Sequence, residues 1–452
     1  MFHSVKRQKN HHSLKSLVLT SSTWAISGYA FAQVLRLVSN VIMAKLLFPE
    51  AFGLMTLVAV FMQGISMFSD IGIIPSIIQN KRGSEPIFLD TAWTMQVIRG
   101  VILWGVAIIG AYPYSIFYDA PLLTSLIPVA GFTAVIAGFN STALATVNRN
   151  LKLKNITLLE IVAQFISIII MIVWVYISPT VWSLVAGGLA SAFIKMILSH
   201  LWIADRRNQF RWEKEAALSL FKFGRWILIS TALSFFAAQI DRILLGYLMG
   251  TATLGIYSIA AMFKETASKA IQMLGNKVLF PSYSKLEREN DPKRLYRALR
   301  KSRVLMIVAT WLATLVLLLL GSQIIEYLYD ERYKAAVWMI QLLPLGTLVG
   351  VLSTTYHNAY LAKGKSSFIS LLLFYQIIIQ SGAISIGYYL HGVHGVIIGL
   401  SVIGWLLYPA NLIAAIRLKI WQPEVDIPII IMSITVIAAY FHYTDIMSLA
   451  ML

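Results

Sequence analysis

Cysteine is absent from the 452-residue sequence, which excludes disulfides, thiolate chemistry and cysteine-based metal sites. Charge is also scarce, because Asp, Glu, Lys and Arg make up 13% of the chain, whereas a soluble domain carries roughly 25%. Hydrophobic residues make up 58%, more than one core can bury, since single cores stop growing near about 250 to 300 residues. The composition excludes an ordinary water-soluble enzyme and predicts a chain whose main solvent is lipid.

Acidic residues are the scarcer charge, since 20 Asp and Glu stand against 37 Lys and Arg, a formal net charge of +17. A nucleic-acid partner would need these bases on one soluble face, but they fall in short runs between apolar stretches. The charge is therefore a topology signal, and we predict no nucleic-acid partner. His3, His11 and His12 share one terminal tail and have no second cluster at ligand spacing, so neither a metal nor a cofactor is predicted.

Twelve apolar runs are each long enough to cross a bilayer core about 30 Å thick, which needs roughly 20 residues. They predict an all-α polytopic membrane protein with helices over 18–46, 51–79, 89–112, 122–147, 155–178, 181–202, 226–248, 252–275, 304–328, 335–361, 366–388 and 394–416. A thirteenth candidate lies at 427–443, so the number of C-terminal helices is left open.

The positions of Lys and Arg predict the orientation, because positive loops are retained on the cytoplasmic side. With the N-terminus inside, most bases fall in the N-terminal tail and in the loops after even-numbered runs. The expected parts are a cytoplasmic basic tail (1–17), an N-lobe of helices 1–6 (18–202), a cytoplasmic connector (203–225), a C-lobe of helices 7–12 (226–416) and a C-terminal segment (417–452). In the connector, Trp212, Leu218 and Phe221 beside bases are typical of an interfacial helix.

An internal repeat appears when the chain is offset by 202 positions. Segment 44–61 then meets 246–263, matching Leu46 with Leu248, Gly53 with Gly255, Ala59 with Ala261 and Phe61 with Phe263. Each half has an even number of helices, so the halves share one orientation and are related by a pseudo-two-fold axis along the membrane normal. This pattern is typical of transporters, with the substrate pathway between the two lobes.

Several motifs resemble a known family. AKLLFPEAFGLMTL (44–57) with FSDIGI (68–73), FKFGRW (221–226) and DRILLGYLMGTATLGIYSIA (241–260) resemble the bacterial lipid-linked oligosaccharide flippases. That family belongs to the multidrug/oligosaccharidyl-lipid/polysaccharide exporter superfamily. The resemblance implies that a polyprenyl-diphosphate-linked glycan is moved from the cytoplasmic to the outer leaflet of the bacterial inner membrane by alternating access. It also implies a glycan polymerase and glycosyltransferases as partners, besides membrane lipid.

Charges within the apolar runs mark candidate substrate contacts, because a midplane charge costs at least about 2.5 to 3.5 kcal/mol unless it faces a cavity or partner. At about 1.5 Å per residue, Arg36, Arg99 and Lys264 lie near the midplane, and Arg242 lies in the outer half. We predict a cationic cavity in which these four bases receive the diphosphate. Arg36 and Arg99 favour this interpretation most, since their runs offer no acid within one helical turn.

The alternative interpretation is that each base is neutralised inside the protein. Asp241 or another acid can pair with Arg242, and Glu265 stands four residues before Lys269 on one helix face. For Lys264 and Arg242 both interpretations stay open. If transport is coupled to an ion, Asp241 and Glu265 are the nearest candidate carriers.

Two other functions are weighed against the flippase. A drug antiporter of the same fold would typically carry acids in its first helix, but here that helix carries Arg36, and a cationic interior repels cationic drugs. A membrane glycan-modifying enzyme would need acids or histidines on a sizeable exposed loop, and the outward loops are short. We therefore expect a carrier and not an enzyme.

The role of the uncharged polar residues in the last predicted runs has two possible interpretations. His357, Asn358, Gln376 and Gln380 are placed to contact sugar hydroxyls or to form hydrogen bonds between helices. Interhelical bonding is the commoner role of such residues. The sequence does not decide between these readings.

Overall fold

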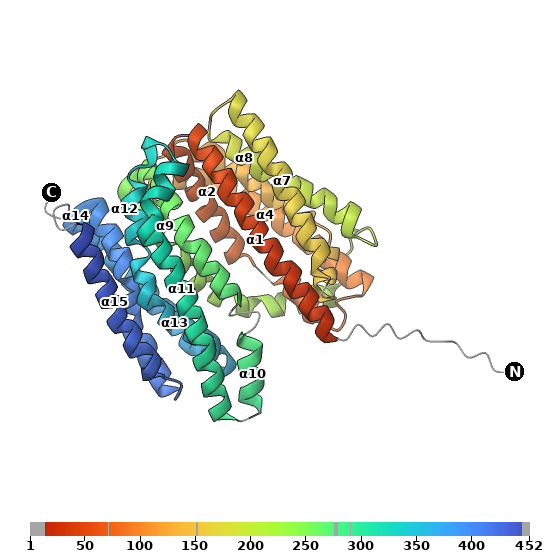
Figure 1. The fold of residues 1–452 in the computed structure, drawn as a ribbon. Coiled ribbons are helices and arrows are strands. Elements are labelled where there is room, and N and C mark those ends of the chain that lie inside the picture. Colours follow the sequence, from red (N-terminus) through yellow and green to blue (C-terminus); the bar gives the residue numbers. More distant parts are fainter. Residues whose placement is uncertain (1–13, 71, 151, 275–278, 290, 445–452) are drawn as a thin grey trace.

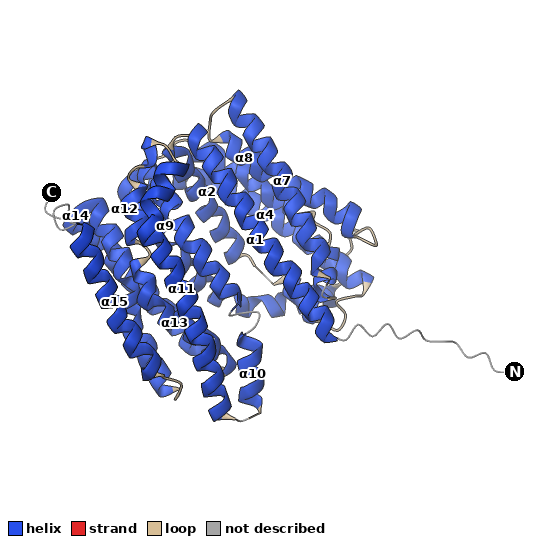
Figure 2. Cartoon of the chain, in the orientation of Figure 1, coloured by secondary structure: helices blue, strands red, loops and turns tan. Residues whose placement is uncertain are grey.

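The computed structural model describes residues 14–70, 72–150, 152–274, 279–289 and 291–444, and in these ranges every regular element is a helix (Figures 1 and 2). Most of the predicted basic tail, 1–17, lies outside them. The N-terminal set comprises α1 (Leu14–Leu46), α2 (Pro49–Phe68), α3 (Ile73–Gln79), α4 (Pro86–Phe117), α5 (Leu123–Gly138), α6 (Ala143–Arg149), α7 (Leu153–Ile177) and α8 (Trp182–Leu198). The C-terminal set comprises α9 (Lys214–Leu274), α10 (Phe280–Arg288), α11 (Pro292–Leu328), α12 (Ala336–Leu342), α13 (Leu345–Ala362), α14 (Ser366–Arg417) and α15 (Pro423–Thr444).

Within the described residues, ten helices are long and apolar enough to cross a membrane, or eleven if α5 and α6, bent by 62°, form one span. The two longest helices are broken internally. Gly250 in α9 has φ 75°, and Gly392 in α14 has φ 55°. Glycine adopts positive φ at little cost, so the chain turns back at these points. Both breaks fall between predicted runs, and α15 confirms that the thirteenth candidate forms a helix.

Several predicted boundaries were wrong; the run 122–147, for example, is divided into α5 and α6. The run 51–79 is divided into α2 and α3, because Gly72 takes φ 61° before α3 begins. The run 304–328 is the end of a longer helix, α11. Its first turn is stabilised by the Asp291 side chain, which accepts a hydrogen bond of 2.9 Å from the Arg294 N–H. The helix therefore begins about three turns before the apolar run does.

The connector between the two sets follows the N-terminal helices. Arg206 forms an ion pair of 2.7 Å with the buried Asp90 of α4. The first turns of α9, where the interfacial helix was predicted, bury Ala216 and Leu220 in an apolar core of the N-terminal set. Leu218 on the same turns is exposed. This stretch is thus amphipathic, as an interfacial helix requires.

The predicted repeat is visible in the packing of the two halves. Contacts occur in pairs that the 202-residue offset exchanges: Gly53 with Thr251 and Gly255 with Pro49, and Gln33 with Thr266 and Phe235 with Gly64. Thr56 and Ser258, which are equivalent under the offset, bond to each other through their hydroxyls at 2.8 Å. Reciprocal contacts of this kind are the signature of two-fold symmetry. The pseudo-two-fold axis therefore passes between α2 and the second part of α9.

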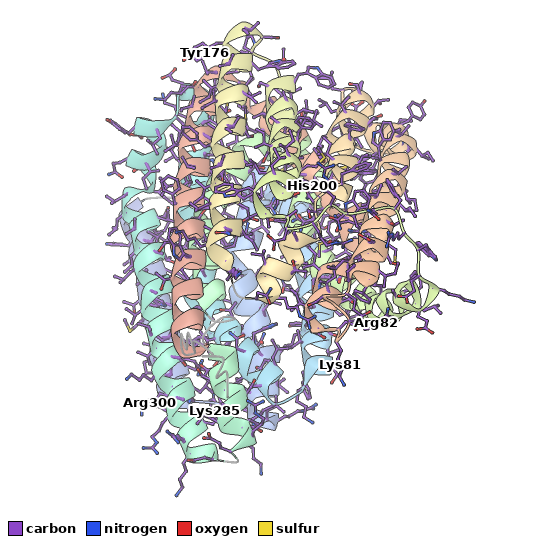
Figure 3. All side chains as sticks on the ribbon, turned by 90° about the vertical axis from the view of Figure 1, so that its right-hand side faces the viewer. Lys81, Arg82, Tyr176, His200, Lys285 and Arg300 are labelled. Atoms are coloured by element: carbon purple, nitrogen blue, oxygen red, sulfur yellow. The ribbon has the colours of Figure 1, made fainter. Side chains whose placement is uncertain are left out.

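The main core that the two sets share in the described residues is built around α2 and the second part of α9. Lys81, Arg82, Lys285 and Arg300 lie toward one end, here called the basic end, and Tyr176 lies at the other (Figure 3). One large core combines Leu57 of α2 with Leu245, Leu254 and Leu348 of the C-terminal set. Of the two smaller cores, one lies within 279–421, and the other lies within 73–220 and takes only the first turns of α9 from the C-terminal set. In Figure 1 the two groups of ribbons accordingly diverge toward α10.

Close packing at the axis gives a test of the repeat interface. A Cβ added at Gly53 would collide with the Thr251 carbonyl, so we expect Gly53→Leu to lower stability by about 1–3 kcal/mol or more through overpacking. Thermal unfolding of the purified protein in detergent measures this. Gly105→Leu is the matched control, because nothing lies within 4 Å of a Cβ there. Equal unfolding temperatures for the two variants would contradict the proposed contact.

Candidate substrate cavity

A cavity of about 490 Å³ lies in the C-terminal set between α9, α11, α13 and α14. This volume is in the range of about 300–1,000 Å³ typical of small-molecule sites. Two charged side chains of α9 line it, Asp241 and Lys264. The neutral polar lining is richer and includes Thr310, Ser353, Thr354, His357, Asn358, Gln376, Gln380 and Asn411. The structure therefore brings together all four polar residues that the sequence left undecided.

Helical spacing explains why these side chains converge. Ser353 and His357, and likewise Thr354 and Asn358, stand four residues apart on α13, so each pair shares one face of the helix. The remainder of α13 is largely buried and apolar, which fixes this face toward the cavity. Gln376 and Gln380 have the same spacing on the opposing α14. Two polar stripes thus face one space.

The Asp241 carboxylate is buried and already bonded. Its Oδ2 accepts a hydrogen bond of 2.5 Å from the Tyr257 hydroxyl, and its Oδ1 accepts one of 2.8 Å from the Arg242 N–H. These bonds hold the carboxyl group of Asp241 in one orientation at the cavity wall.

Arg242 is neutralised within the protein. Its guanidinium forms an ion pair with Glu265, which also pairs with Lys269 at 2.9 Å. Arg242 donates a second bond, of 2.9 Å, to Gln239, which in turn donates to Gln63 of α2 at 2.9 Å. Arg242 and Lys269 therefore make the contacts expected if each base is neutralised by an acid inside the protein. The network also links the two repeats.

Lys264 is the predicted cation that lines the cavity itself. Its ammonium group forms no ion pair or hydrogen bond with any described residue, whereas the neighbouring Arg242 and Lys269 both do. The carboxyl groups of Asp241 and Glu265 act on this half-buried ammonium only from a distance, so an anion in direct contact with it would stabilise it.

The charged constellation belongs to the second repeat alone. At the equivalent positions the first repeat carries uncharged residues, so that Asp241, Arg242, Lys264 and Glu265 correspond to Ser39, Asn40, Met62 and Gln63. The fold is therefore nearly symmetric in this region, but its electrostatics are not. An anionic ligand would be held off the pseudo-two-fold axis, toward the C-terminal set.

Arg36 lies on the inward side of α1. It is exposed and forms no ion pair or hydrogen bond with the described part of the chain. At 100° per residue it lies close to Gln33, which bonds to Thr266 of α9, and opposite Val34 and Val38, which are exposed apolar residues. Arg36 therefore faces away from the apolar surface of α1.

Arg99 makes different contacts from those of Arg36. Its Nη2 donates a bond of 2.7 Å to the Ser66 carbonyl and its Nε donates one of 3.0 Å to the Ser69 carbonyl. These carbonyls belong to the C-terminal end of α2, where unsatisfied C=O groups carry partial negative charge. Arg99 thus caps α2 and does not line the cavity. Of its three guanidinium nitrogens, Nη1 takes part in neither bond.

The sequence analysis missed a buried ion pair. Arg303 was assigned to the basic loop, but its side chain is 0% exposed and donates a bond of 2.6 Å from Nη2 to Asp426, which is also 0% exposed. Tyr356 and Tyr408 donate to the second Asp426 oxygen at 3.0 and 2.9 Å. The sequence contained one indication of this pair, because Arg303 and Asp426 each directly precede an apolar run. The pair fastens α15 to α11 and α13.

Comparison with known proteins now places the chain. Residues 42–338 match the family described as "Polysaccharide biosynthesis protein". The chain belongs to this family. Its motif-level resemblance to lipid-linked oligosaccharide flippases is thereby confirmed.

This family member is similar in sequence to three curated proteins from bacteria. The lipopolysaccharide biosynthesis protein WzxC of Escherichia coli K12 is 20% identical over 86% of this chain and 78% of its own length. The amylovoran biosynthesis protein AmsL of Erwinia amylovora is 25% identical over 57% of this chain and 68% of its own. A putative O-antigen transporter of Shigella flexneri is 21% identical over 78% of this chain and 87% of its own.

Solved structures show the fold of this polysaccharide biosynthesis protein. An inward-facing multidrug resistance MATE transporter of the MOP superfamily superposes with a TM-score of 0.71 at 15% identity, covering 86% of this chain and 94% of that one. The lipid II flippase MurJ in an inward closed conformation superposes with a TM-score of 0.69 at 14% identity, covering 92% of each chain. The family member is accordingly a multi-pass, all-α membrane protein.

In this family member, polar contacts join the two sets at the end opposite the basic end, and Arg332 makes two of them. Arg332, in the loop after α11, donates bonds of 3.2 and 3.0 Å to the carbonyls of Ala44 and Lys45, which lie at the C-terminal end of α1. Arg332 also forms an ion pair with Asp330. The hydrogen bonds that it donates to the Asp330 carboxylate hold the pKa of that carboxyl below its usual value. The guanidinium thus satisfies terminal carbonyls of a helix in the other repeat.

Proposed function

We propose that this protein is a flippase that moves a polyprenyl-diphosphate-linked oligosaccharide from the cytoplasmic to the outer leaflet of the bacterial inner membrane, for surface polysaccharide export. The observation that carries the proposal is an ammonium without an ion pair, Lys264, in a cavity whose polar lining consists mainly of amides and hydroxyls. One ligand that combines an anion with a hydroxyl-rich group is a glycosyl diphosphate. The names of the polysaccharide and O-antigen relatives support the same substrate class.

The orientation follows from the basic end, which we assign to the cytoplasm together with the N-terminus. The main shared core is built around α2 and the second part of α9, and Arg332 bridges the two sets at the end opposite the basic end. This arrangement corresponds to a state that is closed toward the outside and ready to accept a head group from the cytoplasmic leaflet. The polyprenyl tail stays in lipid while the N-lobe (18–202) and the C-lobe (226–416) rock about the axis.

The four cations have different proposed roles. Arg36 and Lys264 are unpaired and contact the diphosphate directly, each contributing about 4 kcal/mol before desolvation at about 4 Å and a dielectric of about 20. Arg242 and Arg99 are already bonded, so their proposed role is to hold α9 and α2 in place.

Asp241 and Glu265 are the proposed coupling residues. Asp241 lines the cavity and Glu265 directly follows Lys264 in α9, so binding of an anion at Lys264 would change their electrostatic surroundings. A polyprenyl-diphosphate glycan must be made by glycosyltransferases and then consumed by a polymerase or ligase. Enzymes of these classes are therefore the proposed partners.

The membrane potential offers a test of the transport direction. With the cell interior negative, moving each negative charge outward is favoured by about 2.3 kcal/mol per 100 mV, and a diphosphate carries about two charges. We expect flipping of a labelled polyprenyl-diphosphate glycan in reconstituted vesicles to slow when the potential is clamped at zero. Undiminished flipping at zero potential would contradict a potential-driven step, and no flipping under either condition would contradict the flippase.

A further inference from the structure

We infer that the cavity in the C-terminal set is a sugar-recognition site that holds the glycan ring attached directly to the diphosphate. The inference rests on the proposed function and deepens it, because it assigns selectivity for the glycan to this lobe. A phosphate bound at Lys264 places the sugar ester-linked to it in the same space. The polar residues that line that space then decide which lipid diphosphates are carried.

The chemistry of the lining fits a neutral, hydroxyl-rich ring. Lys264 and Asp241 carry opposite charges, and the other polar lining groups include the amides of Asn358, Gln376 and Gln380. An amide both donates and accepts hydrogen bonds, as a sugar hydroxyl does, so each can pair with a hydroxyl in either sense. A second phosphate would leave the amide oxygens without a donor, and an apolar chain would leave both ends of each amide unsatisfied.

The decisive observation is that part of this lining has no partner. Asn358 is 4% exposed, yet its Oδ1 forms no hydrogen bond within the described part of the protein. The Ser353 hydroxyl, one turn earlier on α13, is also buried without a partner. Buried side-chain polar atoms are satisfied in the large majority of native structures. Interhelical bonding, the commoner role of such residues, therefore does not account for the Asn358 oxygen, whereas a ligand hydroxyl does.

Space and access to polar groups agree with this assignment. The cavity of about 490 Å³ has room for a small-molecule group, and its polar groups come from two walls, α13 and α14. The Nε2 of Gln376 donates a hydrogen bond of 3.1 Å to the Ala237 carbonyl. Its Oε1, together with Asn358 and Gln380, leaves acceptors and donors on both sides of the space. A ring bound between the walls would be contacted on opposite edges.

The experiment compares two ligands and two variants of the full-length protein. Binding of polyprenyl diphosphate and of polyprenyl diphosphate bearing one N-acetylhexosamine is measured with purified protein in nanodiscs. Wild type is expected to bind the glycosylated lipid at least tenfold more tightly. Asn358→Leu and Gln380→Leu are expected to lose most of that difference while they bind the sugar-free lipid like wild type. Gln341→Leu, an amide of the same lobe outside the cavity lining, is the matched control and should keep the difference.

A stability readout separates ligand recognition from a structural role. Because the Asn358 oxygen bonds to nothing in the described structure, Asn358→Leu should leave the Tm unchanged or raise it. Variants that retain the wild-type preference for the glycosylated lipid, or that weaken binding of both lipids equally, would overturn the sugar site. If wild type binds neither lipid, the proposed function itself fails, and this inference fails with it.

Discussion

Asp426→Ala is expected to destabilise the protein by about 3–5 kcal/mol, the largest effect on stability that the structure predicts. The reason is that Arg303 is 0% exposed and would keep its charge without a carboxylate partner. Thr355, Tyr356 and Gln422 would remain as neutral acceptors for the guanidinium, which is not enough to offset a buried charge. Thermal unfolding in detergent should show a markedly lower Tm.

The double variant Arg303→Met with Asp426→Leu is the informative control. Replacing both partners removes the buried charges together, and such replacements are often neutral or even stabilising. We therefore expect the double variant to be more stable than Asp426→Ala. A second control is Asp330→Ala, which breaks a partly exposed pair and should cost much less. If Asp426→Ala unfolds like wild type, the ion pair does not form.

The second large effect concerns transport. Lys264→Ala and Arg36→Ala are each expected to reduce glycan export by roughly 10- to 100-fold, because a hydrogen bond to a charged group contributes about 1.5–3 kcal/mol. Protein abundance should stay normal, since neither side chain bonds to a described residue. Export is measured in cells as surface polysaccharide and in vesicles as flipped lipid. Wild-type export by both variants would refute their contact with the diphosphate.

Two variants of other basic residues serve as comparisons for the loss of export. Lys269→Ala lies on the same helix as Lys264, but its ammonium pairs with Glu265 and is largely exposed, so export should change little. Arg99→Ala should reduce export and also lower the Tm, because it removes the bonds to the end of α2. A loss of export without any change in Tm would instead indicate direct contact of Arg99 with substrate.

The asymmetry between the repeats bears on how such a carrier works. The backbones of the two repeats meet at the axis through Gly53 and Gly255, which can come this close because neither has a side chain. The charged cluster of α9 around Lys264, in contrast, has uncharged counterparts in the first repeat. A symmetric hinge is thus combined with an asymmetric binding surface. This combination allows the lobes to rock as equivalent bodies while the head group stays attached to the C-terminal set.

The sequence alone determined the solvent, the helical class and the repeat of this protein. These properties depend on apolar runs and on residues at a fixed offset, which are local or periodic features of the chain. The tertiary structure decided which charges are available. Arg99 and Arg242 are engaged by partners on other segments, and Arg303 meets Asp426 across 123 residues. Whether a charge is paired depends on distances of a few ångströms between helices, and no pattern along one chain encodes those distances directly.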